Sequence, residues 1–319
     1  MTPKNSVLTE RCGLDSTCLL NYKKGIISLF QNIKALKRYC YNNKIDLIHG
    51  HDSHAHTLLW MAYRFGGLQI KSVVTRRLIN PIKTRSYKKY NYPKIEKIIC
   101  ISNAVKKVIE PSIADNSRLT VIHSSIKTSR KAIQHKNEVQ SKDFVIGYVA
   151  AFTEEKDHNT FLSTAKHLLQ EYPEISFRFL LIGDGPLLKN IQRASEIIQK
   201  HIKFTGFVED VDSAYLEMNL LLHTSKSEAL GTSILDAMKF GLPIISTKVG
   251  GIPEIVKEDK NGYLFNIGDY QSMGNQIYKI ATDKGLYDFL ASNNEQILSN
   301  FDTSLMVQKT QNLYSEILK

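Results

Sequence analysis

The sequence has few cysteines and no long apolar run. Cysteine accounts for 4 of the 319 residues, too few for the disulfide framework of a small secreted domain. No segment approaches the roughly 18 consecutive apolar residues of a membrane-spanning helix, and the first residues lack the order of a secretory signal. We therefore exclude a membrane-spanning protein and expect a cytoplasmic one. The cysteines are expected to be buried or incidental thiols: Cys12, Cys18, Cys40 and Cys100.

Glycine and proline are also scarce, at 17 and 8 residues, while 42% of the chain is hydrophobic and 23% is charged. This composition excludes a disordered chain, and the length leaves room for two domains of about 100 to 200 residues. Short β-branched runs alternate with amphipathic helical stretches, which predicts parallel α/β sheets. We expect a domain over residues 1–126, a polar linker over residues 127–142, a second domain over residues 143–302, and a C-terminal helix over residues 303–319 packing back on the first domain.

The first domain lacks the usual opening of such a fold. Rossmann-like domains normally begin with a strand and a glycine-bearing turn that leads into a helix. Neither precedes Leu47, because the earlier residues have a mostly helical pattern. We therefore expect an N-terminal domain that is incomplete, through either a start upstream of Met1 or a genuine truncation.

Charge is divided unevenly along the chain. Residues 1–140 hold 25 Lys and Arg against 8 Asp and Glu, a net charge of +17, while the remainder holds 17 against 23, a net charge of −6. Residues 71–97 carry nine basic residues, one acid and three tyrosines. Such a surface could meet nucleic acid, an anionic membrane or a phosphorylated acceptor, or could be solvated without a partner. Since no nucleic-acid-binding signature is present, we expect no nucleic-acid partner.

The most informative segment is SKSEALGTSILDAMKFG. Glu228 and Asp236 are eight positions apart, and Leu230, Gly231 and Thr232 lie between them at the start of an expected helix. A strand end followed by a helix start directs free backbone N–H groups and the positive end of the helix dipole at one point, which suits a phosphate or pyrophosphate. About two helical turns separate the carboxylates, so they can contact different parts of one elongated ligand.

Several motifs occur in a fixed order. The element Glu228-x7-Asp236 is followed by AM, GLPI and GGIPE, and is preceded by GYVAAFTEEKDHNTFL, LLIGDGPLLKNI and IKFTGFVEDVDSAY. This set resembles the retaining glycosyltransferases of family 4, of the GT-B type. LIHGHDSHAH and IICISNAVKKVI are similar to strands of the family's acceptor domain. The resemblance implies two Rossmann-like domains facing a cleft.

The resemblance also implies roles for single residues. Glu228 would face the hydroxyls of the donor sugar, Asp236 would accept hydrogen bonds from the nucleotide ribose, and Lys156 would hold the diphosphate. The family usually has an Arg five positions before this lysine, where this sequence has Ala151. His51 would contact the transferred sugar, so the catalytic candidates are Glu228 and His51. The donor-binding candidates are Lys156, Gly183, Gly185, Leu230, Gly231, Thr232 and Asp236.

Two patterns raise the question of a metal ion. The H-x-H-x-x-H-x-H spacing from His49 to His56 could hold one, but strand alternation puts His49 and His51 on one face and leaves His54 and His56 as structural histidines.

Residues 210–212 read D-V-D. A D-x-D motif holds a divalent ion in another class of glycosyltransferase, although here it more simply caps a helix. We expect a metal-independent protein with no cofactor. Lys189, after the GDGP turn, could reach a phosphate.

Together these features predict a hexosyltransferase that moves a sugar from a nucleotide-diphosphate sugar to an envelope glycan or glycolipid acceptor, as in lipopolysaccharide or capsule biosynthesis. Retention at the anomeric carbon is implied only by the resemblance. The protein would be cytoplasmic. The anionic surface on the inner face of the cytoplasmic membrane is a candidate partner. A nucleotide-sugar epimerase and a non-catalytic nucleotide-sugar-binding remnant are the alternatives, and the base, sugar and acceptor are left open.

Overall fold

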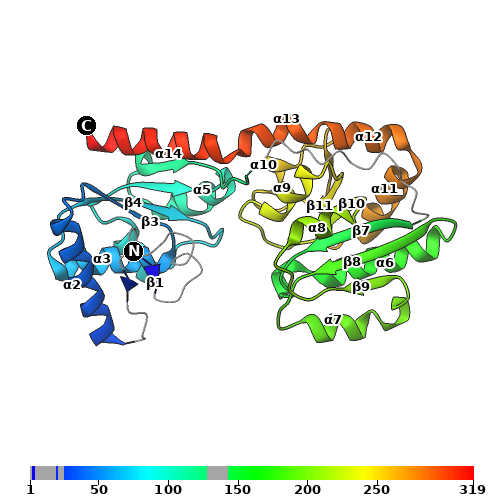
Figure 1. Ribbon diagram of the computed structural model, residues 1–319, viewed down its shortest axis with the longest axis horizontal. Coiled ribbons are helices and arrows are strands. Elements are labelled where there is room, and N and C mark those ends of the chain that lie inside the picture. Colours follow the sequence, from blue (N-terminus) through cyan, green and yellow to red (C-terminus); the bar gives the residue numbers. More distant parts are fainter. Residues whose placement is uncertain (1, 4–18, 21–24, 128–142) are drawn as a thin grey trace. The chain divides into compact units, whose positions relative to one another are not determined.

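The computed structural model describes residues 2–3, 19–20, 25–127 and 143–319. Residues 128–142 of the expected linker, as well as Cys12 and Cys18, lie outside the described residues. The chain divides into two compact units (Figure 1). Unit 1 comprises residues 1–101, 105–122 and 310–319, and unit 2 comprises residues 102–104 and 123–309.

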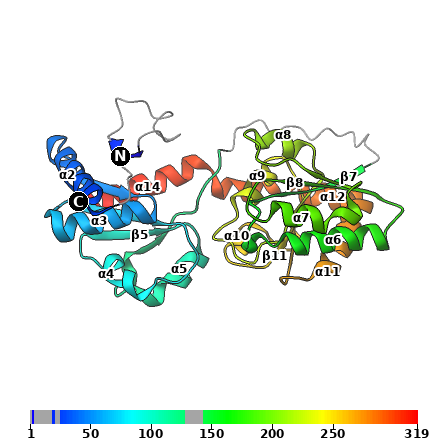
Figure 2. The same ribbon diagram turned by 90° about the horizontal axis from the view of Figure 1, so that it is seen from below.

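Unit 1 contains a four-stranded sheet in the order β3-β4-β5-β6, with every neighbouring pair parallel. Helices α2 and α3 lie side by side in both views (Figures 1 and 2). A separate parallel pair of two-residue strands, β1 (Thr2–Pro3) and β2 (Leu19–Leu20), precedes them. The other elements are α2 (Ile26–Asn42), β3 (Leu47–Gly50), α3 (Ser53–Gly66), β4 (Lys71–Arg76), α4 (Tyr87–Tyr90), β5 (Ile95–Cys100), α5 (Asn103–Ile109) and β6 (Leu119–Val121).

Local chemistry sets the ends of α3. The Asp52 carboxylate accepts hydrogen bonds from the backbone N–H groups of His54 and Ala55, at 2.8 and 2.7 Å, and so caps the first turn. The helix stops at Gly67, whose left-handed backbone suits a glycine at this position. His54 therefore lies in the first turn of α3, while His56 is buried with Nε2 3.3 Å from the Lys89 carbonyl oxygen.

Unit 2 contains a six-stranded parallel sheet in the order β12-β11-β10-β7-β8-β9. The chain builds β7, β8 and β9 in one direction, then returns to place β10 against the other side of β7. This reversal between β7 and β10 is a topological switch point, where doubly wound sheets bind ligands at the carboxyl ends of their strands. The strands are β7 (Asp143–Val149), β8 (Ser176–Ile182), β9 (Ile202–Phe204), β10 (Leu220–His223), β11 (Ile244–Thr247) and β12 (Gly262–Phe265).

Helices connect these strands, as parallel crossovers require, and they enclose a core of aromatic and aliphatic side chains. Tyr148 and Phe161 are stacked and fully buried in this core. The helices of unit 2 are α6 (His158–Glu171), α7 (Leu188–Ala194), α8 (Val211–Leu216), α9 (Thr232–Lys239), α10 (Ile252–Ile255), α11 (Tyr270–Thr282), α12 (Lys284–Ser292) and α13 (Asn294–Leu298).

The last helix, α14 (Thr303–Leu318), contributes residues to both units. Within unit 1, the Lys71 ammonium donates to the Ile317 carbonyl oxygen at 2.8 Å, and Lys97 lies 3.7 Å from a carboxylate oxygen of Glu316. These contacts attach the end of α14 to β4 and β5.

No helix within the described ranges is long and apolar enough to span a membrane.

The prediction of two parallel α/β, Rossmann-like domains is thus confirmed.

Candidate functional site

Two oppositely charged side chains meet at the switch point of unit 2. Lys156 ends the short 3₁₀ turn Glu154–Lys156 that follows β7, and Glu228 lies in the loop between β10 and α9. Although 72 positions separate them in the chain, Lys156 Nζ lies 2.5 Å from Glu228 Oε2. The structure therefore brings together the residue expected to hold the diphosphate and the one expected to face the sugar.

The Glu228 carboxylate is ionised at neutral pH. Burial by itself would raise its pKa, but a hydrogen bond from His223 and the charge of Lys156 outweigh burial and lower the pKa to about 2. Only 16% of the Glu228 side chain is exposed. An ionised carboxylate can only accept hydrogen bonds, so Glu228 is suited to contact hydroxyl groups.

The loop that carries Glu228 leads directly into α9. Leu230 is buried, Gly231 occupies the N-cap position with a left-handed backbone, and Thr232 begins the helix. No side chain of the described residues caps this end, and the first N–H groups of a helix have no partner within it. The start of α9 can therefore receive an anion beside Glu228.

The GGIPE segment packs against the same loop and donates a backbone hydrogen bond to it. The Gly251 N–H donates to the Glu228 carbonyl oxygen at 3.0 Å. A Cβ on Gly251 would stand 2.4 Å from the Ala229 carbonyl oxygen, so only glycine permits this close approach.

Gly183 and Gly185 lie in the turn after β8. A Cβ on Gly183 would stand 2.1 Å from the Ala150 carbonyl oxygen, and one on Gly185 would stand 2.7 Å from backbone atoms of Phe152. The two glycines therefore let this turn pack tightly against the loop after β7, the loop that also leads to Lys156. Their expected contact with the donor stays a prediction. Lys189 is exposed on α7.

Asp236 lies on α9, partly exposed. Burial raises its pKa, with Asp212 acting in the same direction and Lys239 opposing it. Among the described side chains, Asp236 forms no hydrogen bond or ion pair with Lys156 or Glu228. Its expected contact with a ribose stays a prediction.

The two histidines of β3 and the following loop lie together in unit 1. The rings of His49 and His51 have centroids 3.9 Å apart. His49 Nε2 lies 2.7 Å from Thr75 Oγ1, and His49 Nδ1 lies 2.5 Å from the Tyr314 hydroxyl on α14. Burial is the main cause that lowers the pKa of both histidines, to about 3 for His49. Both rings are therefore neutral at pH 7, and His49 supports His51 from one side.

The metal-binding patterns have other roles in the structure. Asp210 is the N-cap of α8, and its carboxylate accepts from the Asp212 N–H at 3.1 Å. Asp212 in turn lies 3.3 Å from Lys239 Nζ. No group of three or more His, Cys, Asp or Glu side chains within the described ranges could hold a metal ion.

Sequence reasoning did not assign a role to Glu254, the last residue of GGIPE. One of its carboxylate oxygens accepts from the Asn103 N–H and side-chain amide and lies 2.8 Å from His123 Nε2, while the other accepts from the Ala104 N–H. Burial would raise the pKa of Glu254, but the hydrogen bonds from His123 and these amides lower it to about 2. The motif was visible in the sequence, but its partners were not.

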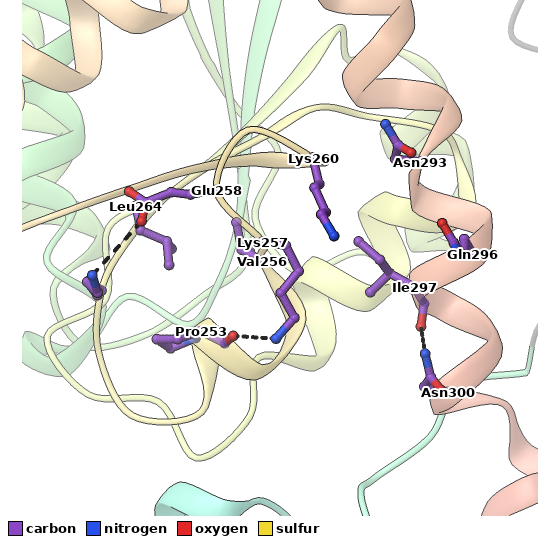
Figure 3. A pocket seen from close by; sticks show the side chains of 11 residues that line it. Pro253, Val256, Lys257, Glu258, Lys260, Leu264, Asn293, Gln296, Ile297 and Asn300 are labelled. Atoms are coloured by element: carbon purple, nitrogen blue, oxygen red, sulfur yellow. Dashed lines mark hydrogen bonds and ion pairs between the residues drawn. The ribbon is translucent and has the colours of Figure 1, made fainter.

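A surface hollow of about 540 Å³ lies elsewhere in unit 2 (Figure 3). Three exposed lysines, Lys248, Lys257 and Lys260, stand around it, and Lys257 donates to the Pro253 carbonyl oxygen at 2.8 Å. The hollow contains none of the site residues expected from the sequence. We therefore place the candidate site at the Lys156–Glu228 pair.

Comparison with known proteins identifies the family of this chain. Residues 129–297, just over half of the chain, match the family of glycosyl transferases group 1. The chain belongs to the group 1 glycosyl transferases. Residues 14–130 match the glycosyltransferase family 4 model, so the two matches cover both the His49–His51 and the Lys156–Glu228 regions of this glycosyl transferase.

Individual relatives extend over most of the chain. An Escherichia coli UDP-Gal:alpha-D-GlcNAc-diphosphoundecaprenol alpha-1,3-galactosyltransferase is 23% identical over 320 residues, 94% of this chain and 81% of its own. A glycosyltransferase from Rickettsia africae has a similar structure, with a TM-score of 0.82 and 18% identity over 100% of this chain and 89% of its own. The Anabaena protein HepE, in complex with UDP and glucose, has a TM-score of 0.75 and 20% identity over 93% of this chain and 85% of its own.

Proposed function

We propose that the protein transfers a hexose from a nucleotide-diphosphate sugar to an envelope glycan or glycolipid acceptor, with retention at the anomeric carbon. The observation that carries the proposal is the Lys156–Glu228 pair, which lies at the topological switch point beside the uncapped start of α9. A sugar diphosphate needs a cation and free helix amides for its phosphates and a carboxylate for its sugar hydroxyls. These groups occur together here at the carboxyl ends of the strands.

The chemistry follows from these groups. Lys156 and the first amides of α9 donate to the diphosphate, while Glu228 accepts from a hydroxyl of the donor sugar. The bond between the anomeric carbon and the phosphate oxygen breaks, and the leaving nucleoside diphosphate gains negative charge that Lys156 stabilises. The acceptor oxygen forms the new bond on the same face, and its proton passes to the departing phosphate oxygen. Retention rests on the family resemblance.

The remaining roles also rest on the resemblance and form part of the proposal. Asp236 contacts the nucleotide ribose, the Gly183–Gly185 turn lines the donor site, and His51 contacts the transferred sugar. Transfer requires no metal ion, so we expect EDTA to leave the rate unchanged. A rate that falls with EDTA and returns with Mg²⁺ or Mn²⁺ would contradict this part.

The names of similar proteins support the choice of substrates to test. HepE was crystallised with UDP and glucose, so UDP is the first nucleotide to try. The E. coli relative acts on a diphosphoundecaprenol-linked sugar, which supports a lipid-linked acceptor of lipopolysaccharide or capsule type. We further propose that the basic residues 71–97 contact the anionic inner face of the cytoplasmic membrane. Binding to vesicles containing phosphatidylglycerol should then weaken as salt rises, and salt-insensitive binding would count against it.

Nothing in the described residues favours an epimerase or a non-catalytic remnant over a transferase. The alternatives differ in outcome: an epimerase converts the donor without an acceptor, and a remnant binds nucleotide without turnover. Product analysis with and without acceptor separates the three.

The direct test is calorimetric titration with UDP, GDP and ADP, followed by transfer assays with the matching nucleotide sugars. We expect Lys156→Ala to weaken binding of the diphosphate and Glu228→Ala to abolish transfer. Lys260→Ala and Glu258→Ala, exposed charges near the surface hollow, serve as matched controls. Folded wild-type protein that binds no nucleotide, or wild-type turnover by Glu228→Ala, would refute the proposal.

A further inference from the structure

A buried histidine, His223, contacts the Glu228 carboxylate. His223 ends β10, and its side chain is 1% exposed. Its Nε2 lies 3.0 Å from Ser225 Oγ and 3.5 Å from Glu228 Oε2. Its Nδ1 is buried and has no hydrogen-bond partner within the described part of the chain. The proposed mechanism gives this residue no role.

The hydrogen bonds around His223 have a direction that the fold imposes. The Lys156 carbonyl oxygen can only accept, so the Tyr148 hydroxyl, 2.6 Å away, donates its single proton there. The Ser225 hydroxyl lies 3.1 Å from the Tyr148 hydroxyl and must therefore donate to it. Ser225 Oγ is then left to accept from His223, which places a hydrogen on His223 Nε2.

The opposite tautomer is disfavoured on two counts. It would bury an N–H at Nδ1 without an acceptor, and such a group loses its hydrogen bonds to water without replacement. It would also direct the Nε2 lone pair toward the ionised Glu228 carboxylate. Burial is the main cause that lowers the pKa of His223, so the ring is a neutral donor at pH 7.

The same network holds the backbone on both sides of the ion pair. The Thr224 hydroxyl donates to the Asp157 carbonyl oxygen at 3.0 Å, and the Thr247 hydroxyl donates to the Ser225 carbonyl oxygen at 2.5 Å. The first bond attaches the loop after β10 to the loop after β7, and the second attaches it to β11.

We infer that His223 is a positioning residue, whose single Nε2–H is shared between Ser225 Oγ at 3.0 Å and Glu228 Oε2 at 3.5 Å, and so orients the Glu228 carboxylate while the chain through Ser225 and Tyr148 fixes the backbone at Lys156. Because Lys156 and His223 both approach Oε2, and no hydrogen bond among the described residues uses Oε1, the latter oxygen is kept for a substrate hydroxyl. The consequence for transfer rests on the proposed function, whereas the tautomer does not.

Two substitutions test the inference against a purely structural role. His223→Leu removes the donor, whereas His223→Gln keeps an N–H near the position of Nε2. We expect His223→Leu to lower kcat roughly ten- to a hundredfold, as the loss of a hydrogen bond to a charged group does, with little change in UDP affinity. His223→Gln should recover most of kcat. His201→Leu replaces a histidine immediately before β9 that does not contact Glu228; it is the matched control and should keep wild-type kcat.

A measurement without turnover tests the tautomer. In protein labelled with ¹⁵N-histidine, we expect the His223 ring to show a protonated Nε2 and an unprotonated Nδ1, and Ser225→Ala to shift the Nε2 resonance. A protonated Nδ1 would overturn the inference whatever the activity. Wild-type kcat in His223→Leu, or an equal loss in the Leu and Gln variants with equally lowered melting temperatures, would also overturn it. If the wild-type protein transfers no sugar, the proposed function fails, and the resonance still decides the tautomer.

Discussion

Replacement of Glu228 by glutamine should destabilise the protein in a way that depends on pH. The carboxyl has a pKa of about 2 in the folded protein against an ordinary value of 4.5. A depressed pKa contributes stability that is present above the unfolded value and is lost as pH falls through the folded value. The stabilisation by the charged form should therefore be complete at pH 7 and decline between about pH 4.5 and 2.

The size of this destabilisation follows from the shift in the pKa of Glu228. One pKa unit corresponds to about 1.4 kcal/mol, so a shift from 4.5 to about 2 corresponds to about 3 kcal/mol. Because the side chain is 16% exposed, solvent screening reduces this only modestly. Glu228→Gln keeps the size of the side chain and removes the charge, so its free energy of unfolding should fall by up to about 3 kcal/mol at pH 7 and by less than half of that near pH 3.

Urea denaturation of the wild type and Glu228→Gln at pH 7, 5, 4 and 3 measures this difference. Glu258→Gln is the control, since Glu258 is exposed in the same unit, and its effect should stay within about 0.5 kcal/mol at every pH. A Glu228→Gln difference that is the same at pH 7 and pH 3, or that is absent at pH 7, would refute the reasoning that His223 and Lys156 lower this pKa.

Three further changes have defined outcomes. Tyr314→Phe removes one hydrogen bond to His49 and should lower the free energy of unfolding by about 1 kcal/mol in urea; an unchanged midpoint would mean that the bond is not formed in solution. Gly251→Ala would place a Cβ 2.4 Å from the Ala229 carbonyl oxygen, so transfer should fall at least about tenfold while circular dichroism stays unchanged, and wild-type turnover would contradict the role of this turn. Lys156→Met should raise the Kd for UDP by about tenfold or more, the loss of one charge-assisted hydrogen bond; equal binding would place the diphosphate elsewhere.

The sequence alone was sufficient to predict the fold class and the part of the site that is formed by the loop carrying Glu228. Strand and helix periodicity is local, so the alternation of parallel strands and helices could be predicted without any contact being known. Glu228, Gly231 and Thr232 lie close together in the chain, and their order between a strand and a helix is enough to indicate an anion site at a strand end. An N-cap role for Asp210 or Asp212 also followed from their position before a helix, and the structure gives this role to Asp210.

The partners of these residues were decided only by the tertiary structure. Lys156 meets Glu228 because β10 returns to pair with β7, and strand order in a parallel sheet is set by crossover connections that local periodicity does not encode. His223 carries no motif, and its relation to Glu228 depends on burial and on a hydrogen-bond chain through Tyr148, a residue of another strand. Such contacts arise when separate strand ends converge at one edge of a sheet, so the sequence determined which groups were available and the packing of strands determined which of them meet.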